Sequence, residues 1–61
     1  MITREFAERY RDSYEKGLTV EEYVDFYKDC QQAAPEDKEF AALTEAELAE
    51  LATLVIEINE G

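Results

Sequence analysis

The sequence predicts an all-α protein: a small three-helix bundle that forms one domain over residues 1–61. Apolar residues recur at intervals of three and four along three segments, approximately 3–16, 19–34 and 44–59, and this spacing is typical of amphipathic helices. No segment alternates with the period of a strand. Two glycines and one proline are the only residues of those types, and none falls inside these three segments. Short connections between the segments favour a bundle.

The first predicted helix covers residues 3–16. Phe6, Tyr10 and Tyr14 recur every four residues, which places their rings in one narrow apolar stripe. Gly17 follows directly and suits the left-handed conformation in which many helices end.

The second predicted helix, 19–34, has a clear start signal. Thr19 is followed three residues later by Glu22, the pattern of a capping box in which the two side chains satisfy each other's backbone N–H groups. Pro35 is expected to end this helix, because a proline pushes the preceding residue out of the helical region.

The segment that follows predicts a short fourth helix over residues 36–42, with Pro35, Glu36 and Asp37 in its first turn and Phe40 directed inward. Proline and acidic residues are both favoured at that end of a helix. A structured loop is the alternative interpretation of the same residues.

The last predicted helix, 44–59, repeats the capping pattern with Thr44 and Glu47. Its apolar stripe is formed by Leu48, Leu51, Val55 and Ile58. Two additional apolar residues, Leu54 and Ile56, lie on either side of that stripe. A bundle this small cannot bury them all, so part of this helix is expected to contact a neighbouring segment, a second copy or a partner.

The composition argues against an enzyme and against a cofactor or metal site. The chain has no histidine, and therefore no general base with an ordinary pKa near neutrality. Its single cysteine, Cys30, lacks an imidazole to activate it and is interpreted as a buried structural residue. The acidic run Glu36, Asp37 and Glu39 has neither the spacing nor the glycine of a calcium-binding loop.

The same composition predicts a cytoplasmic protein with no membrane partner. No apolar run approaches the roughly 20 residues that span a bilayer, and no signal-peptide pattern opens the chain. A lone cysteine is consistent with a reducing compartment.

The net charge of −10 is unevenly distributed. Residues 1–17 hold equal numbers of acidic and basic residues, so the whole excess lies on residues 18–61. Such a field repels nucleic acids and anionic membranes and attracts basic surfaces. We therefore expect no direct binding of nucleic acid, although arginines alternate with tyrosines in the first segment.

The leading hypothesis is a small acidic inhibitor that occupies a basic, nucleic-acid-binding surface of a partner protein. Its size and charge resemble those of the DNA mimics that mobile elements use against restriction or CRISPR systems. Carboxylates at helical spacing form the candidate partner-binding face. They are Glu21, Glu22, Asp25 and Asp29 on the second predicted helix, and Glu50 and Glu57 on the last.

The alternative hypothesis is a helical interaction or regulatory module, such as an adaptor or an antitoxin-like partner, that binds through apolar surface. Its candidate contact residues are Phe26, Leu54 and Ile56. The charge would then serve solubility alone. Both hypotheses are compatible with a monomer or a weak homodimer.

Overall fold

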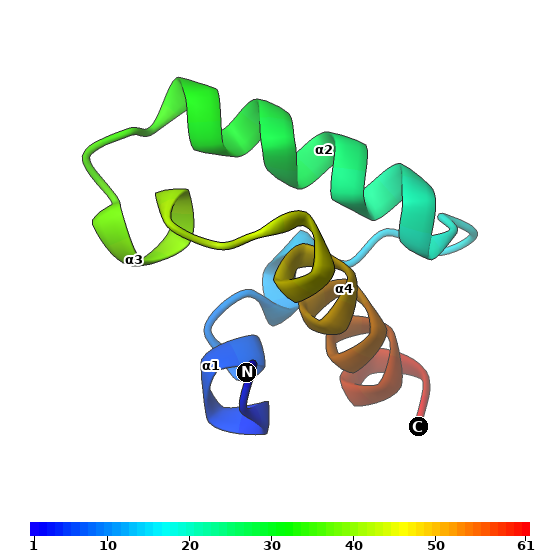
Figure 1. Cartoon of the computed structure of the whole chain (residues 1–61). Coiled ribbons are helices and arrows are strands. Elements are labelled where there is room, and N and C mark those ends of the chain that lie inside the picture. The colour runs from blue at the N-terminus through cyan, green and yellow to red at the C-terminus, as the bar shows by residue number, and fades with distance from the viewer.

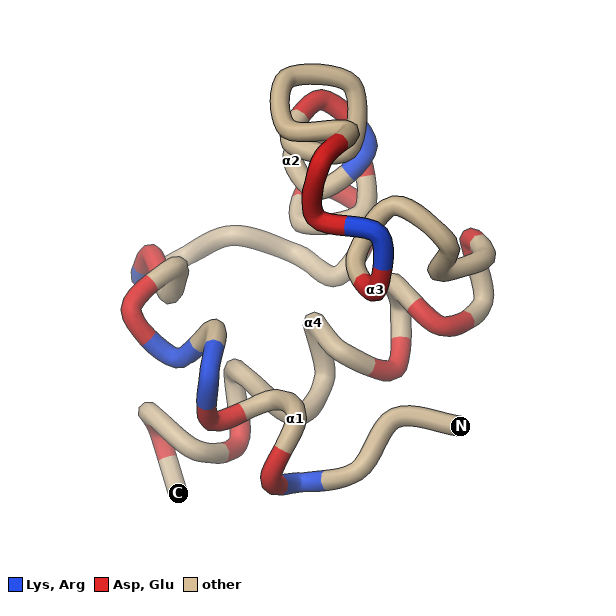
Figure 2. The backbone as a smooth tube through the Cα atoms, turned by 90° about the vertical axis from the view of Figure 1, so that its left-hand side faces the viewer, with Lys and Arg blue, Asp and Glu red and all other residues tan.

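The computed structural model describes residues 1–61 and contains helices but no strands, which confirms the predicted all-α class. The elements in chain order are α1 (Arg4–Glu8), the 3-10 helix η1 (Arg11–Ser13), α2 (Val20–Ala33), α3 (Lys38–Ala41) and α4 (Glu45–Glu60). The two long helices, α2 and α4, make the most extensive contact between elements, and α2 lies across α4 (Figures 1 and 2). The helices α1 and α3 are short segments beside this crossing (Figure 1).

The predicted helix over residues 3–16 is wrong, because α1 ends at Glu8 and a turn separates it from η1. The hydroxyl of Ser13 donates a hydrogen bond to the Tyr10 carbonyl at 2.6 Å and shares a second with the Tyr27 hydroxyl at 2.8 Å. A side chain that bonds a nearby carbonyl competes with continued helix. Tyr14 then adopts an extended backbone. The architecture is therefore two long crossed helices with three short helical segments, not three long helices.

The start of α2 agrees with the prediction. The Thr19 hydroxyl accepts the Glu22 backbone N–H at 3.2 Å, and the Glu22 carboxylate accepts the Thr19 N–H at 3.0 Å. The helix ends at Ala33, one residue before the predicted boundary, and Ala34 is its C-cap before Pro35.

The same arrangement begins α4, where Thr44 and Glu47 form the second capping box at 3.2 and 2.9 Å. Each box satisfies two backbone donors that a helix start otherwise leaves unpaired. Both predicted starts are thus confirmed to the residue that caps them.

The short helix between α2 and α4 is also present, as α3, but the predicted register of its first turn is wrong. Pro35 and Glu36 form a turn outside the helix. Asp37 is the N-cap, and its carboxylate accepts the Phe40 backbone N–H at 3.3 Å. The Gln31 side chain on α2 holds this segment in place by donating to the carbonyls of Phe40 and Leu43 at 2.9 and 3.0 Å.

The core lies where α2 and α4 cross. It contains Ile2, Ala7, Tyr23, Val24, Tyr27, Phe40, Leu48, Leu51, Ala52 and Val55. The stripe predicted for α4 is buried at Leu48, Leu51 and Val55, whereas Ile58 is half-buried. The Phe40 ring meets Tyr27 edge-on with centroids 5.7 Å apart, an arrangement that aromatic pairs prefer.

Gly17 has φ +93°, the left-handed conformation predicted for it, although it lies in the loop before α2 and not at a helix end. No helix combines the length and the apolar character needed to cross a bilayer.

Candidate functional site

The acidic residues predicted on α2 lie on its solvent side. Glu21, Glu22, Asp25 and Asp29 are all exposed. The residues between them, Tyr23, Val24 and Tyr27, are buried against the rest of the molecule. Figure 2 shows that acidic positions recur along both long helices, whereas most basic positions lie in the N-terminal segment. The predicted carboxylate face of α2 therefore exists as a surface.

The acidic pair predicted on α4 is also exposed. Glu50 and Glu57 are seven residues apart, two turns of helix, and so share one face. The Glu50 carboxylate accepts the backbone N–H of Ile2 at 3.3 Å, which attaches the N-terminal residues to α4.

Few of the carboxylates are neutralised by a cation. The structure contains three ion pairs against sixteen acidic residues. They join the N-terminal ammonium to Glu47 at 3.3 Å, Arg9 to Glu39 at 3.0 Å, and Lys28 to Glu45 at 2.6 Å. None of the six candidate residues takes part in them. Most of the acidic side chains thus have no ion-pair partner.

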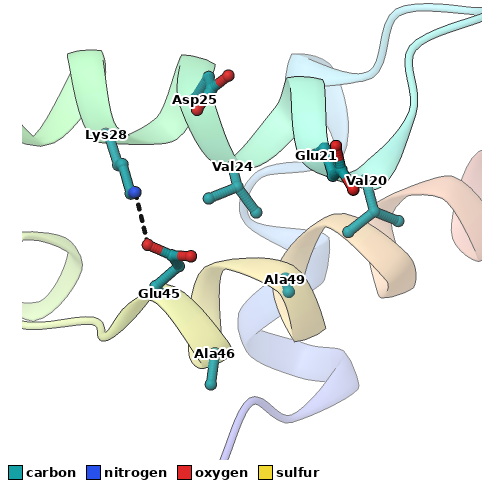
Figure 3. A pocket seen from close by; sticks show the side chains of 8 residues that line it. All are labelled: Val20, Glu21, Val24, Asp25, Lys28, Glu45, Ala46 and Ala49. Atoms are coloured by element: carbon teal, nitrogen blue, oxygen red, sulfur yellow. Dashed lines mark hydrogen bonds and ion pairs between the residues drawn. The ribbon is translucent and has the colours of Figure 1, made fainter.

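A groove runs between α2 and α4, with a volume of about 560 Å³. We call it the α2–α4 groove. It is lined by Val20, Glu21, Val24, Asp25 and Lys28 of α2 and by Glu45, Ala46 and Ala49 of α4 (Figure 3). In Figure 3, Val20 and Val24 point from α2 toward α4, while Asp25 stands on the outer side of α2. The groove thus has an apolar floor and a charged rim.

A second groove, of about 450 Å³, adjoins the first and shares Ala46 and Ala49 with it. Its remaining lining residues are Ile2, Glu50, Thr53 and Leu54. The two grooves bring Glu21 and Asp25 of α2 and Glu50 of α4 to one connected surface. Glu22, Asp29 and Glu57 line neither groove.

The Lys28–Glu45 pair bridges the α2–α4 groove and was not predicted from the sequence. Its side chains are 43% and 73% exposed. Its hydrogen bond raises the pKa of Lys28 and lowers the pKa of Glu45. Lys28 and Glu45 are seventeen residues apart and meet only because α2 lies across α4, so no local sequence signal identifies the pair.

The apolar candidates lie in different surroundings. Phe26 is 46% exposed, although its ring is 5.6 Å from that of Tyr27. Leu54 and Ile56 are half-buried and pack against the core, and Leu54 lines the second groove together with Ile2. These three residues do not form one exposed apolar patch in the chain.

The arginine and aromatic residues of the N-terminal segment contact one another and neighbouring elements. The Arg9 guanidinium lies 4.6 Å above the Phe6 ring while it pairs with Glu39 of α3. The Tyr10 ring lies 5.2 Å from those of both Phe6 and Phe40. The packing of these rings agrees with the interpretation that they belong to the apolar core.

Cys30 is less enclosed than predicted, because its free thiol is half-buried at the edge of the core. No group of three or more cysteine, aspartate or glutamate side chains is arranged to hold a metal ion.

No protein-family model, curated protein or solved structure matches this chain.

Proposed function

We propose that this chain is a cytoplasmic, non-catalytic inhibitor that binds a basic, nucleic-acid-binding surface of another protein. The observation that supports the proposal is the exposed carboxylate surface of α2 and α4, where Glu21, Asp25 and Glu50 border two connected grooves without a cationic partner. Mimicry of phosphate is the mechanism, as in the inhibitors that mobile elements direct against restriction or CRISPR systems.

The spacing of the acids supports phosphate mimicry. Glu22, Asp25 and Asp29 are three and four residues apart on one exposed helix. A helix rises about 1.5 Å per residue, so these charges recur about every 4.5 to 6 Å. One strand of duplex DNA carries a charge about every 3.4 Å along its axis. The two linear charge densities differ by less than about a factor of two.

A partner with a basic surface would associate rapidly and in a salt-dependent manner. Charge complementarity between the two proteins raises the rate of association and fixes their orientation. The same negative charge on this chain repels the nucleic acid itself. A module that binds through Phe26, Leu54 and Ile56 is less supported, because two of those side chains are half-buried against the core.

The experiment is displacement of a fluorescently labelled DNA duplex or guide RNA from purified restriction endonucleases and RNA-guided nucleases. We expect the wild-type chain to release the label from at least one of them at low salt and less well at high salt. The double variant Asp25→Lys, Asp29→Lys should fail to displace it.

The matched control is the double variant Glu8→Lys, Asp12→Lys. Both residues are exposed in the N-terminal segment, and the change in net charge is the same. This control should retain most of the displacement. If both double variants lose displacement equally, net charge alone explains it and the carboxylate face of α2 has no specific role. Displacement that survives Asp25→Lys, Asp29→Lys would contradict the proposal.

A further inference from the structure

We infer that the α2–α4 groove receives an apolar side chain of the partner, carried on a segment rich in arginine or lysine. The occupant is thus a basic peptide segment with an apolar residue at its centre. This inference rests on the proposed function and specifies what the partner presents. It adds a contact that phosphate mimicry alone does not require.

The floor of the groove selects an apolar group. Val24 is buried, with 8% of its surface exposed, and Val20 and Ala49 are half-buried. On the α4 side the groove is lined by Ala46 and Ala49, whose side chains are single methyl groups and leave the space beside the two valines open. An aliphatic side chain placed there removes apolar surface from water on both partners.

The rim selects positive charge and places it. Lys28 is already paired with Glu45 at 2.6 Å, so the carboxylates left for an occupant are those of Glu21 and Asp25. The cationic side chains of the occupant therefore lie nearest Glu21, which is seven residues, or about two turns of helix, from Lys28. A second copy of this chain is a poor occupant, because each copy carries a net charge of −10.

Two synthetic peptides test this inference against the wild-type chain. One has the sequence Arg-Arg-Leu-Arg-Arg and the other Arg-Arg-Ser-Arg-Arg, both with blocked ends, and their affinities are measured by titration calorimetry at two salt concentrations. We expect the leucine peptide to bind about tenfold more tightly, as burial of most of a leucine side chain allows. Raised salt should lower the affinity of both peptides and leave the ratio of the two affinities unchanged. Equal affinities would overturn the inference.

A variant that fills the groove without changing its charge is Ala46→Phe. Ala46 is exposed and lines both grooves, so a phenyl ring at this position takes up groove space and not core space. We expect the preference for the leucine peptide to disappear. Ala33→Phe, also exposed but outside the groove at the end of α2, should keep it. An unchanged preference in a folded Ala46→Phe chain would overturn the inference.

A measurement on the wild-type chain covers the case in which Ala46→Phe fails to fold. The leucine peptide should shift the methyl NMR signals of Val20, Val24 and Ala49 more than the serine peptide does. Shifts confined to other methyl groups would contradict binding in the groove.

The results separate this inference from the proposed function. Selective binding of the leucine peptide, with no nuclease losing its nucleic acid, would support the groove and contradict the inhibitor. Displacement that is lost in Asp25→Lys, Asp29→Lys but retained in Ala46→Phe would support the inhibitor and overturn the groove as a contact site.

Discussion

The phenol of Tyr23 on α2 holds both backbone groups of Glu15 in the preceding loop. It accepts the Glu15 N–H at 2.6 Å and donates to the Glu15 carbonyl at 3.0 Å. Tyr23 has no exposed surface, so the two bonds form beneath the loop and attach the N-terminal segment to the long helix. This contact replaces the continuous first helix that the sequence predicted.

Replacing Tyr23 with phenylalanine should lower the free energy of unfolding by about 1 to 3 kcal/mol. Each hydrogen bond contributes about 0.5 to 1.5 kcal/mol, and the Glu15 backbone groups lose their partner. Urea denaturation followed by circular dichroism measures the change. Tyr14→Phe is the control, since the Tyr14 hydroxyl bonds only the exposed Glu60 carboxylate, and its effect should be smaller. A stability equal to that of the wild type would contradict the role assigned to Tyr23.

The helix starts were predictable because the groups that define them are three residues apart. Thr19 with Glu22, and Thr44 with Glu47, form their boxes within one turn. The break after Glu8 was not predictable, because the hydrogen bond between the Ser13 and Tyr27 hydroxyls joins residues fourteen positions apart. Periodicity alone favoured continued helix there. Tertiary contacts decide whether the helix continues or breaks after Glu8, and no short stretch of sequence contains them.

The candidate site also has one part that the sequence predicts and one part that depends on packing. Helical spacing identified the exposed acids of α2, because the same spacing places Tyr23 and Tyr27 inside. The grooves depend on the angle at which α2 lies across α4, and that angle is a property of the packed molecule. The sequence pattern therefore identifies the charges but not the apolar floor beside them, which Val20 and Val24 form only once α2 packs on α4.

Thr44→Ala should destabilise the protein by about 1 kcal/mol, the usual effect of removing an N-cap side chain. The Thr44 hydroxyl accepts the Glu47 N–H at 3.2 Å, and alanine leaves that donor without a partner from the cap. Thermal melts followed by circular dichroism measure the loss. Thr53→Ala is the matched control: Thr53 is exposed inside α4, where alanine is the better helix former. An equal loss in both variants would argue against the cap.

The protein should unfold as pH rises above 10. Burial raises the pKa of Tyr27. Burial, and to a smaller extent the negative charge of Asp37, raises the pKa of Tyr10. The hydrogen bond to Glu60 raises the pKa of Tyr14 to about 12. A pKa that is raised on folding adds stability below the unfolded value, and this stability is lost as pH passes through the raised value. The unfolded value for tyrosine is 10.0, so the window runs from pH 10.0 to about 12.

Tyrosinate absorbance and helical circular dichroism, recorded over the same alkaline titration, test this expectation. Absorbance should rise above pH 10 together with loss of helix. A full rise centred at pH 10 with the helices intact would contradict the raised pKa values.

Salt should raise the melting temperature. Thirteen of the sixteen acidic side chains have no ion-pair partner, and their mutual repulsion disfavours the compact state. Between about 10 mM and 1 M salt the screening length falls from about 30 Å to about 3 Å. The variant Asp25→Asn, Asp29→Asn should melt at a higher temperature in low salt and respond less to added salt. A melting temperature that falls with salt would show that the three ion pairs outweigh the repulsion.

The amide of Gln31 has a kinetic consequence. Its two hydrogen bonds, to the carbonyls of Phe40 and Leu43, and the insertion of the Phe40 ring against Tyr27 are what secure residues 34–43 to α2. The exposed Arg9–Glu39 pair and the Tyr10 ring add contacts from the N-terminal segment. A segment held by a small number of side-chain contacts opens on its own, at a lower free energy than the whole chain. Its backbone amides should exchange with deuterium ahead of those in α2 and α4, and the first protease cut should fall there. Gln31→Ala should therefore speed exchange in residues 34–43 while α2 and α4 stay folded.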